Sequence, residues 1–184
     1  MIRAKTLAEI DAFAFGAHAD QVDKIGVPYI EHVRAVAAGL VPFGEELVMA
    51  GLLHDVIEDT DWTAAQLLAL GVPLRVVGVV KDVTNQPGVS YDEKIRRIVR
   101  SRNATLVKIS DNAHNSHPDR AAQLPEEKRV RLAAKYRAAR DVLWAAADDQ
   151  DIETIVRIVN PALLDELRDR QTALESTHQP GSSA

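Results

Sequence analysis

Proline and glycine residues divide the sequence into segments of helical length, and this spacing constrains the fold more than any other feature. The breaks fall at Gly26–Pro28, Pro42–Gly44, Gly71–Pro73, Pro87–Gly88, Pro118 and Pro125. Between the breaks apolar residues recur at helical intervals, as they do from Val33 to Leu40 in "YIEHVRAVAAGL". Thr63 and Ser90 stand where helix N-caps are expected. The chain is therefore predicted to be a set of packed helices.

The apolar composition favours the all-α class. Apolar residues make up 46% of the 184 residues and aromatic residues only 4%, so Ala, Val, Leu and Ile dominate the core, as suits closely packed helices. The stretches "RVVGVVKDV" and "ATLVKIS" are rich in β-branched residues, but neither alternates cleanly. We therefore interpret both as buried helices.

The length of the chain fits one domain with a sizeable core. We predict a single-domain helical bundle over residues 1–174 and a disordered tail over residues 175–184, because "ESTHQPGSSA" is polar and rich in Pro, Gly and Ser. A long surface helix is predicted from Pro125 to about Asp148. This helix, or "IETIVRIVNPALLDEL" after it, could contribute to a homo-oligomer, a question that the sequence leaves open.

Charge and cysteine content exclude several classes of function. The formal net charge is −5 with both signs interspersed, which argues against broad contact with nucleic acid or an anionic membrane. The absence of cysteine excludes disulfides and thiolate metal sites and fits a reducing compartment. The first residues lack the apolar core of a signal peptide, and no apolar run reaches membrane-spanning length. A soluble cytoplasmic protein is expected.

The run "LLHDVIEDT", residues 52–60, places polar side chains in an apolar segment, where uncompensated charge is costly. In a continuous helix His54 and Glu58 would lie one turn apart, as would Asp55 and Asp59. Imidazole and carboxylate suit a divalent transition metal, and further carboxylates nearby could take the proton of a metal-bound water. For the His-Asp pair alone, a capped and solvated helix end is the more frequent interpretation, because short motifs recur by chance.

Two other polar positions strengthen the metal interpretation. His32 lies on an otherwise apolar helix, and Asp111 follows the apolar run in "LVKISDNAHNSHPDR". A single buried histidine more often bonds a backbone carbonyl than a metal. Joined to His54 and Asp55, however, these residues supply two imidazoles and two carboxylates, a complete set of protein ligands that leaves room for water and substrate.

Three ordered motifs resemble a known family. The segments "AHADQVDKIGVPYIEHVRAVA", "AGLLHDVIEDTD" and "VKISDNAHNS" resemble the HD-domain metal-dependent phosphohydrolases, specifically the RelA/SpoT-type (p)ppGpp hydrolase domain. That family pairs "AHxGQxRKxGxPYIxHP" with "HDxVEDT" and "VKLADRLHN" in the same order. The resemblance covers roughly Ile10 to Trp144. It implies an all-helical HD domain, without a synthetase region, that hydrolyses the 3′-pyrophosphate of (p)ppGpp or a related nucleotide.

The resemblance also implies roles for single residues. The implied metal ligands are His32, His54, Asp55 and Asp111. Manganese is the usual ion in that family. Glu58 and Asp59 fall on the pair that positions and deprotonates the attacking water, so they are the implied catalytic residues. Lys24 matches a lysine near the substrate phosphates, and Asn115 matches an asparagine that contacts the nucleotide.

The sequence departs from the family motifs where the base is recognised. Asp23 replaces the arginine that packs against guanine, and a carboxylate cannot provide that cationic surface. After Asp111 the family's "RLHNMRT" becomes "NAHNSHP", which loses an arginine and a threonine. Arg120 is a candidate for the lost positive charge. The exact nucleotide is therefore left open.

Two alternatives to an alarmone hydrolase follow from these departures. One is a phosphatase of another nucleotide or of a phosphorylated dinucleotide cofactor. The other is a non-catalytic HD domain that binds metal and nucleotide as a sensor, which the presence of Glu58 and Asp59 argues against. His18, His114 and His117 are interpreted as neighbours of the metal site and not as ligands, because four ligands are already assigned.

Overall fold

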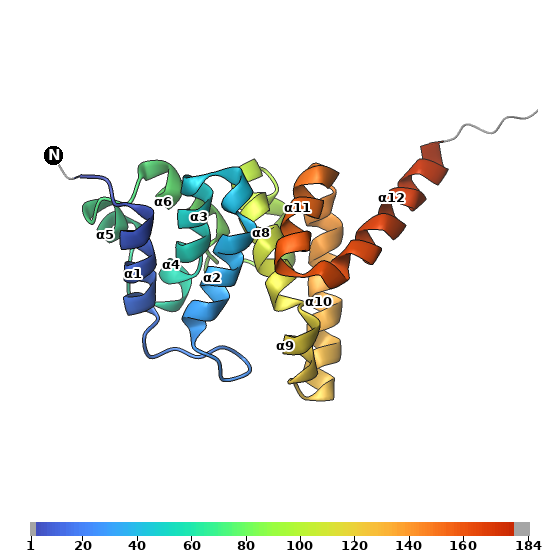
Figure 1. Cartoon of the computed structure of the whole chain (residues 1–184), viewed down its shortest axis with the longest axis horizontal. Coiled ribbons are helices and arrows are strands. Elements are labelled where there is room, and N and C mark those ends of the chain that lie inside the picture. Colours follow the sequence, from blue (N-terminus) through green and yellow to red (C-terminus); the bar gives the residue numbers. More distant parts are fainter. Residues whose placement is uncertain (1–2, 179–184) are drawn as a thin grey trace, which may run out of the picture.

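The computed structural model describes residues 3–178 of the chain, and the regular structure in that range is helical. The α-helices span Leu7–Ala17 (α1), Tyr29–Gly39 (α2), Glu45–Leu53 (α3), Val56–Asp59 (α4), Ala64–Ala69 (α5), Leu74–Val83 (α6), Tyr91–Ile98 (α7), Arg102–Asn115 (α8), Pro118–Ala122 (α9), Glu126–Trp144 (α10), Asp149–Val159 (α11) and Leu164–His178 (α12). Short 3-10 turns at Val41–Phe43 and Pro161–Leu163 join neighbouring helices. The predicted all-α class is confirmed (Figure 1).

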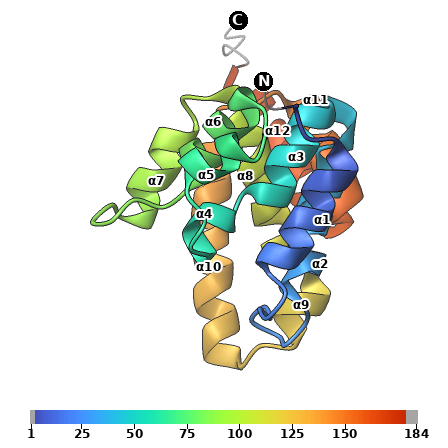
Figure 2. The same cartoon turned by 90° about the vertical axis from the view of Figure 1, so that its left-hand side faces the viewer.

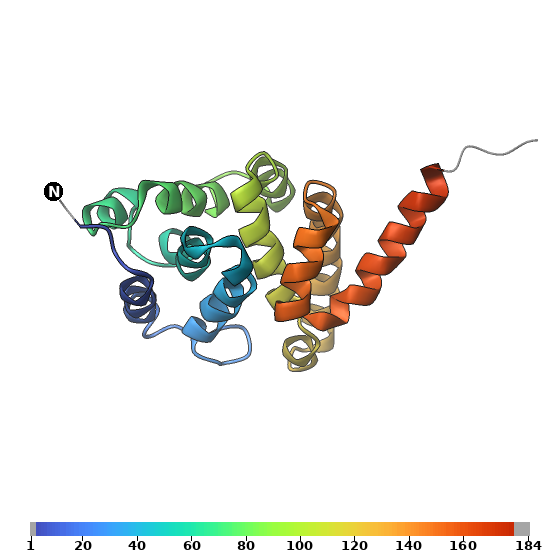
Figure 3. The same cartoon turned by 45° about the horizontal axis from the view of Figure 1, so that its top comes forward.

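Helix α8 is the centre of the packing. It contacts α2, α3 and α6 on one side and α10 and α11 on the other, and Figure 3 shows it between these two groups. Every residue from Ala104 to Ala113 is buried, so the segment "ATLVKIS" is apolar on all sides because it has neighbours on all sides. Helix α6 buries its five valines and exposes Leu74, Arg75, Lys81 and Asp82. Both β-branched stretches are helices, as predicted.

Helices α2 and α3 approach each other closely at Gly51. A Cβ atom on Gly51 would lie 2.9 Å from the Cα atom of Ala37 and 2.8 Å from Leu40 Cδ1, which is shorter than atoms normally approach. The absence of a side chain at this position therefore allows the two backbones to pack together. This close packing brings His32 on α2 next to His54, which directly follows α3.

The helix ends show the expected capping chemistry. Thr63 forms a reciprocal capping box with Gln66, and the Ser90 hydroxyl accepts the backbone N–H of Glu93. Pro118 and Pro125 stand at the start of α9 and directly before α10. The predicted long helix is therefore present, although it ends at Trp144 and not near Asp148.

Two predicted boundaries differ from the structure. The segment 45–59 is not one helix, because α3 ends at Leu53 and α4 starts at Val56. The His54 ring bonds the Gly51 carbonyl, and the Asp55 carbonyl accepts the N–H groups of Glu58 and Asp59, which starts a new turn.

Helix α12 also extends beyond the predicted domain end at residue 174, through residues 175–178. No proline or glycine interrupts it there. The rest of the predicted tail, residues 179–184, lies outside the described residues. Figures 1 and 2 show α12 leaving the body of the molecule and the long α10 extending beyond its neighbours. None of the helices in residues 3–178 combines the length and apolar content needed to cross a bilayer.

Candidate active site

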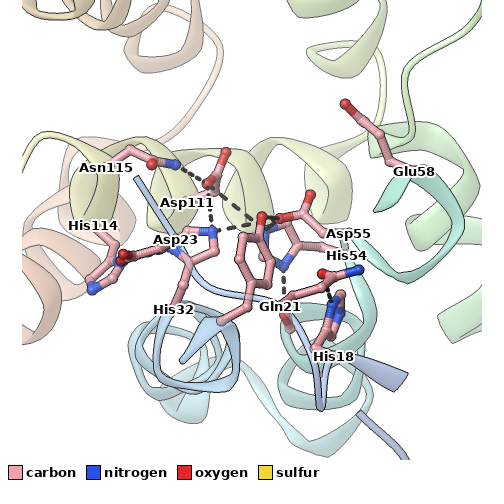
Figure 4. Close-up of polar contacts among 12 residues, drawn as sticks. His18, Gln21, Asp23, His32, His54, Asp55, Glu58, Asp111, His114 and Asn115 are labelled. Carbon is pink, nitrogen blue, oxygen red and sulfur yellow. Dashed lines mark hydrogen bonds and ion pairs between the residues drawn. The ribbon is translucent and has the colours of Figure 1, made fainter. Parts of the chain in front are cut away.

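Three separate segments bring the four predicted metal ligands together (Figure 4). His32 comes from α2, His54 and Asp55 from the turn between α3 and α4, and Asp111 from α8. We call these four residues the metal-ligand cluster. The cluster is largely buried, with side-chain exposures of 3% for His32, 2% for His54 and 8% for Asp111. Its members are up to 79 positions apart in the sequence, so the fold creates the site.

The distances in the metal-ligand cluster fit one divalent ion. His54 Nε2 lies 2.9 Å from Asp55 Oδ2, and His32 Nε2 lies 3.6 Å from the same oxygen. Asp111 Oδ1 lies 3.4 Å from His32 Nε2 and 3.8 Å from His54 Nε2. Ligands bound at about 2.0–2.2 Å from a common ion are separated by about 3–4 Å, so all four distances are compatible with shared coordination.

The hydrogen bonds of His54 leave its Nε2 atom directed into this cluster. Its Nδ1 lies 2.7 Å from the Gly51 carbonyl, which can only accept, so Nδ1 carries the hydrogen. The buried Nε2 has no hydrogen-bond partner among the described residues, although carboxylate oxygens are near it. A lone pair facing carboxylates requires a cation between them. Burial lowers the pKa of His54, but Asp55 and Asp111 outweigh burial and raise it to about 10, so a proton serves as that cation when no metal is present.

A second histidine contact orients His32. Its Nδ1 lies 2.7 Å from His114 Nδ1, so one ring must donate to the other. Burial, together with the positive charge near His114, lowers the pKa of His114 to about 3, which keeps this ring neutral and able to accept. His32 then donates from Nδ1 and keeps the lone pair of Nε2 for the centre, the arrangement typical of metal-bound histidines. His114 thus contacts a predicted ligand, whereas the His117 ring caps α9.

Both carboxylates of the cluster are held in their ionised form. Asp111 accepts hydrogen bonds from Lys108 Nζ and Asn115 Nδ2, each at 2.5 Å. Asp55 accepts the hydroxyl of Tyr29 at 2.6 Å. Burial alone would raise the pKa of each carboxyl, but neighbouring positive charge and hydrogen-bond donors hold both well below the ordinary value. The Tyr29 contact was not predicted, because an aromatic residue in an apolar segment more often indicates core packing.

The predicted catalytic pair is divided between two directions. Glu58 points away from the metal-ligand cluster in Figure 4 and accepts hydrogen bonds from Lys94 Nζ and the Asn85 backbone N–H, both at 2.8 Å. Asp59 lies nearer to Asp55, and desolvation followed by the Asp55 and Glu58 charges raises its pKa. The continuous helix expected here is wrong, because α3 ends at Leu53 and α4 starts at Val56, but Asp55, Glu58 and Asp59 still line one cavity.

A chain of contacts holds this turn in place. The Nδ1 atom of the buried His18 lies 2.7 Å from Gln21 Oε1, and Gln21 Nε2 donates to the Asp59 carbonyl at 2.7 Å. His18 also packs against the Tyr29 ring, with centroids 5.0 Å apart. These residues fix the position of Asp59 relative to the cluster, and His18 is not itself part of it.

A cavity of about 390 Å³ opens onto the metal-ligand cluster. Seven of the eight predicted site residues line the cavity, and the exception is the buried His54. Lys24, Glu58, Asp59 and Asn115 therefore face the same space. Its cationic side chains are Lys24, Lys94, Lys108, Arg120 and Lys135. Its acidic side chains are Asp23, Asp55, Glu58, Asp59 and Asp111. Such a mixture suits a divalent ion and an anionic ligand together.

Position 23, where the family motif has an arginine, holds an aspartate that pairs with Arg120 in this cavity. The Asp23 side chain is only 3% exposed, and Oδ1 accepts the backbone N–H groups of Ile25 and Val27 at 2.9 and 3.0 Å. Oδ2 accepts Arg120 Nη1 at 2.5 Å. Asp23 therefore stabilises its own loop and holds a guanidinium from α9 at the cavity. Arg120 is a cavity residue, and nothing in the sequence near position 23 could have revealed this pairing.

Known proteins resemble this chain in sequence and in structure. No protein-family model matches the chain. The guanosine-3′,5′-bis(diphosphate) 3′-pyrophosphohydrolase MESH1 of Danio rerio is 36% identical over 120 residues, which cover 59% of this chain and 66% of that protein. This chain belongs to the HD-type (p)ppGpp hydrolase family.

Other members of the hydrolase family give the same result. The bifunctional (p)ppGpp synthase/hydrolase SpoT of Escherichia coli is 34% identical over 141 residues, or 70% of this chain but only 20% of the E. coli protein. The chain thus matches about a fifth of the length of that relative. A solved structure described as a metazoan ortholog of SpoT that hydrolyses ppGpp superposes with a TM-score of 0.66 at 25% identity, covering 85% of this chain and 97% of that one.

Proposed function

We propose that this chain is a metal-dependent hydrolase that removes the 3′-pyrophosphate from (p)ppGpp. The observation that carries the proposal is the convergence of His32, His54, Asp55 and Asp111 at the base of a cavity rich in cationic side chains. Relatives named as (p)ppGpp 3′-pyrophosphohydrolases support it. The cytoplasm remains the compartment expected from the sequence, and homo-oligomerisation remains open.

We further propose Mn²⁺ as the ion and the metal-ligand cluster as its protein ligands. The lone pair on His54 Nε2 and the converging carboxylates fit a divalent cation, which would lower the pKa of bound water and neutralise a phosphoryl oxygen. Lys108 and Asn115 orient the Asp111 carboxylate through 2.5 Å hydrogen bonds. Tyr29 does the same for Asp55.

Within this proposal Asp59 accepts the proton of the attacking water. Its pKa is raised by desolvation and by neighbouring carboxylates, which makes it a stronger base than an ordinary aspartate. Glu58 faces the same cavity and accepts hydrogen bonds from Lys94 Nζ and the Asn85 N–H, so it orients the water or the leaving group. Lys24 and Arg120 hold the substrate phosphates, with Arg120 supplying the positive charge that the sequence lacks after Asn115.

The test is hydrolysis of ppGpp by the purified chain with Mn²⁺, followed by chromatography of intact products. We expect GDP and pyrophosphate from the wild type and no product from Asp55→Ala. Equal turnover by both proteins would reject the proposed site. Comparing Mn²⁺ with Co²⁺, Zn²⁺ and Mg²⁺ on chelator-treated protein tests the identity of the ion.

A second candidate is a phosphatase of a different nucleotide, and Asp23 is the observation that favours it. Its carboxylate is fully used by Ile25, Val27 and Arg120, so no arginine extends from this loop position to stack on guanine. A panel of nucleoside phosphates and phosphorylated dinucleotide cofactors, assayed beside ppGpp, discriminates the two. Consumption of another compound with ppGpp left intact would establish the second candidate.

A further inference from the structure

Two of the cationic side chains in the cavity have no carboxylate partner. Arg120 is paired with Asp23, Lys94 with Glu58, and Lys108 with Asp111, at distances of 2.5, 2.8 and 2.5 Å. Lys24 and Lys135, by contrast, form no ion pair with any residue that the structure describes. Lys135 belongs to none of the three family motifs, and no role was predicted for it.

Both lysines lie beside the Tyr136 side chain. Lys24 Nζ donates to the Tyr136 hydroxyl at 2.8 Å. Lys135 Nζ lies 3.9 Å from the centroid of the Tyr91 ring and 5.9 Å from that of Tyr136. Each ammonium group has three N–H donors, so both keep donors that no protein acceptor uses. The Tyr136 hydroxyl, which accepts from Lys24, also keeps its own hydrogen for a further acceptor.

The charges near these lysines indicate that an anion is missing. Desolvation lowers the pKa of both lysines. The Asp111 charge offsets part of this effect at Lys24, whereas the Lys24 charge adds to it at Lys135. The cavity is lined by five acidic and five cationic side chains. A divalent ion at the metal-ligand cluster would therefore leave the cavity positively charged, and Lys24 and Lys135 are its cationic side chains without an ion-pair partner among the described residues.

We propose that Lys24 and Lys135, together with the Tyr136 hydroxyl, bind a phosphate group of the substrate other than the one attacked at the metal-ligand cluster. This inference rests on the proposed function, because it assumes a phosphorylated substrate in this cavity. The substrate of the proposed function carries phosphates at two separate positions, and the new element of the inference is the part played by Lys135. Lys135 is then a specificity-determining residue that favours such compounds over those carrying a single phosphate group.

The test is a lysine footprint that does not depend on turnover. The wild-type chain with Mn²⁺ is acetylated briefly by an N-hydroxysuccinimide ester, with and without inorganic pyrophosphate, and each lysine is quantified by mass spectrometry. We expect pyrophosphate to slow acetylation of Lys24 and Lys135 by about tenfold, as for loss of a charge-assisted contact. Lys81, exposed on α6, is the internal control and should not change. Equal acetylation of Lys135 with and without pyrophosphate would overturn the inference.

The Lys135→Met variant distinguishes pyrophosphate that is held by the two lysines from pyrophosphate that is held by the metal alone. The pyrophosphate concentration that half-protects Lys24 should rise about tenfold in this variant. This half-protecting concentration should not change in Arg137→Met, which removes an exposed charge from another face of α10. Unaltered protection of Lys24 in Lys135→Met would contradict the inference.

The footprint and the hydrolysis assay can fail independently. Protection of Lys135 without any ppGpp turnover would support the phosphate site and reject the proposed hydrolase. Turnover of ppGpp without protection of Lys135 would retain the hydrolase and reject the site. If both succeed, Lys135→Met should raise KM for ppGpp more than KM for guanosine 3′-diphosphate, which lacks the 5′ phosphates.

Discussion

Two regions of one cavity are incomplete in opposite ways. At the metal-ligand cluster, each of two imidazole nitrogens lies 2.9–3.8 Å from both carboxylates, an arrangement that requires a cation. At the cationic wall, formed by Lys24, Arg120 and Lys135, two ammonium groups have only tyrosine partners. The two regions therefore require ligands of opposite charge: the metal-ligand cluster requires a cation, and the cationic wall requires an anion. A divalent ion and a phosphorylated ligand together would balance both.

The largest expected effect comes from breaking the metal-ligand cluster. Asp55→Asn removes one negative charge from the centre and weakens the acceptor of the Tyr29 hydroxyl. Hydrolysis of ppGpp should fall by about 10³-fold or more, because the ion and the water bound to it are lost together. Initial rates measured by chromatography with Mn²⁺ check this. Asp61→Asn, an exposed acid nearby, should keep wild-type rates, and a matching loss there would point to a general charge effect.

A smaller effect should follow from changing a neighbour of the cluster without removing a ligand. His114→Ala deletes the partner of His32 Nδ1, so the His32 ring loses the contact that fixes its orientation. Affinity for Mn²⁺ should weaken by about 10- to 100-fold while the fold is retained. Calorimetric titration measures this, with His117→Ala as the control at full affinity. Equal affinities in His114→Ala and wild type would show that the two-histidine contact has no part in the site.

A substitution in the cationic wall should raise KM for ppGpp and leave kcat nearly unchanged. In Asp23→Asn the side-chain oxygen can still accept the N–H groups of Ile25 and Val27, but the charged contact to Arg120 is lost. We expect KM for ppGpp to rise about tenfold with little change in kcat. Asp20→Asn, on the exposed part of the same loop, serves as the control. A fall in kcat at constant KM would instead assign Asp23 to the chemical step.

A separate prediction concerns stability in the absence of metal. His54 has a pKa of about 10 in the folded chain and about 6.5 when unfolded, so the folded state holds one more proton between these values. The free energy of unfolding of chelator-treated protein should therefore decrease from pH 7 to 9, by at most about 1.4 kcal/mol per pH unit. Urea titrations at several pH values measure this slope. His54→Gln should flatten it, and an increase of stability with pH would contradict the assignment.

The fold and the metal-ligand cluster could be predicted because their signals are local or belong to ordered motifs. The helical spacing of Val33 to Leu40, and the lack of alternation in "ATLVKIS", correctly indicated helices. His32, His54, Asp55 and Asp111 meet because each lies on or next to a helix that packs against α8 or its neighbours. Their roles as ligands stay a prediction until an ion is measured.

The contacts around the cavity could not be predicted, because they join residues far apart in sequence. Arg120 reaches Asp23 across 97 positions, and Lys24 reaches Tyr136 across 112. The break at His54 depends on a side-chain bond to Gly51 that competes with the regular helix, and it turned Glu58 toward Lys94. Periodicity describes which face a residue occupies, but it does not identify the partner on another helix.

The most direct test of the central claim is the binding of Mn²⁺ to the chelator-treated chain, followed by electron paramagnetic resonance. The convergence of α2, the turn at residues 54–55 and α8 predicts about one bound ion per chain in the wild type. It also predicts loss of that ion in Asp111→Ala, whose side chain comes from the third segment. The absence of a bound ion in the wild type, or unchanged binding in Asp111→Ala, would contradict the account.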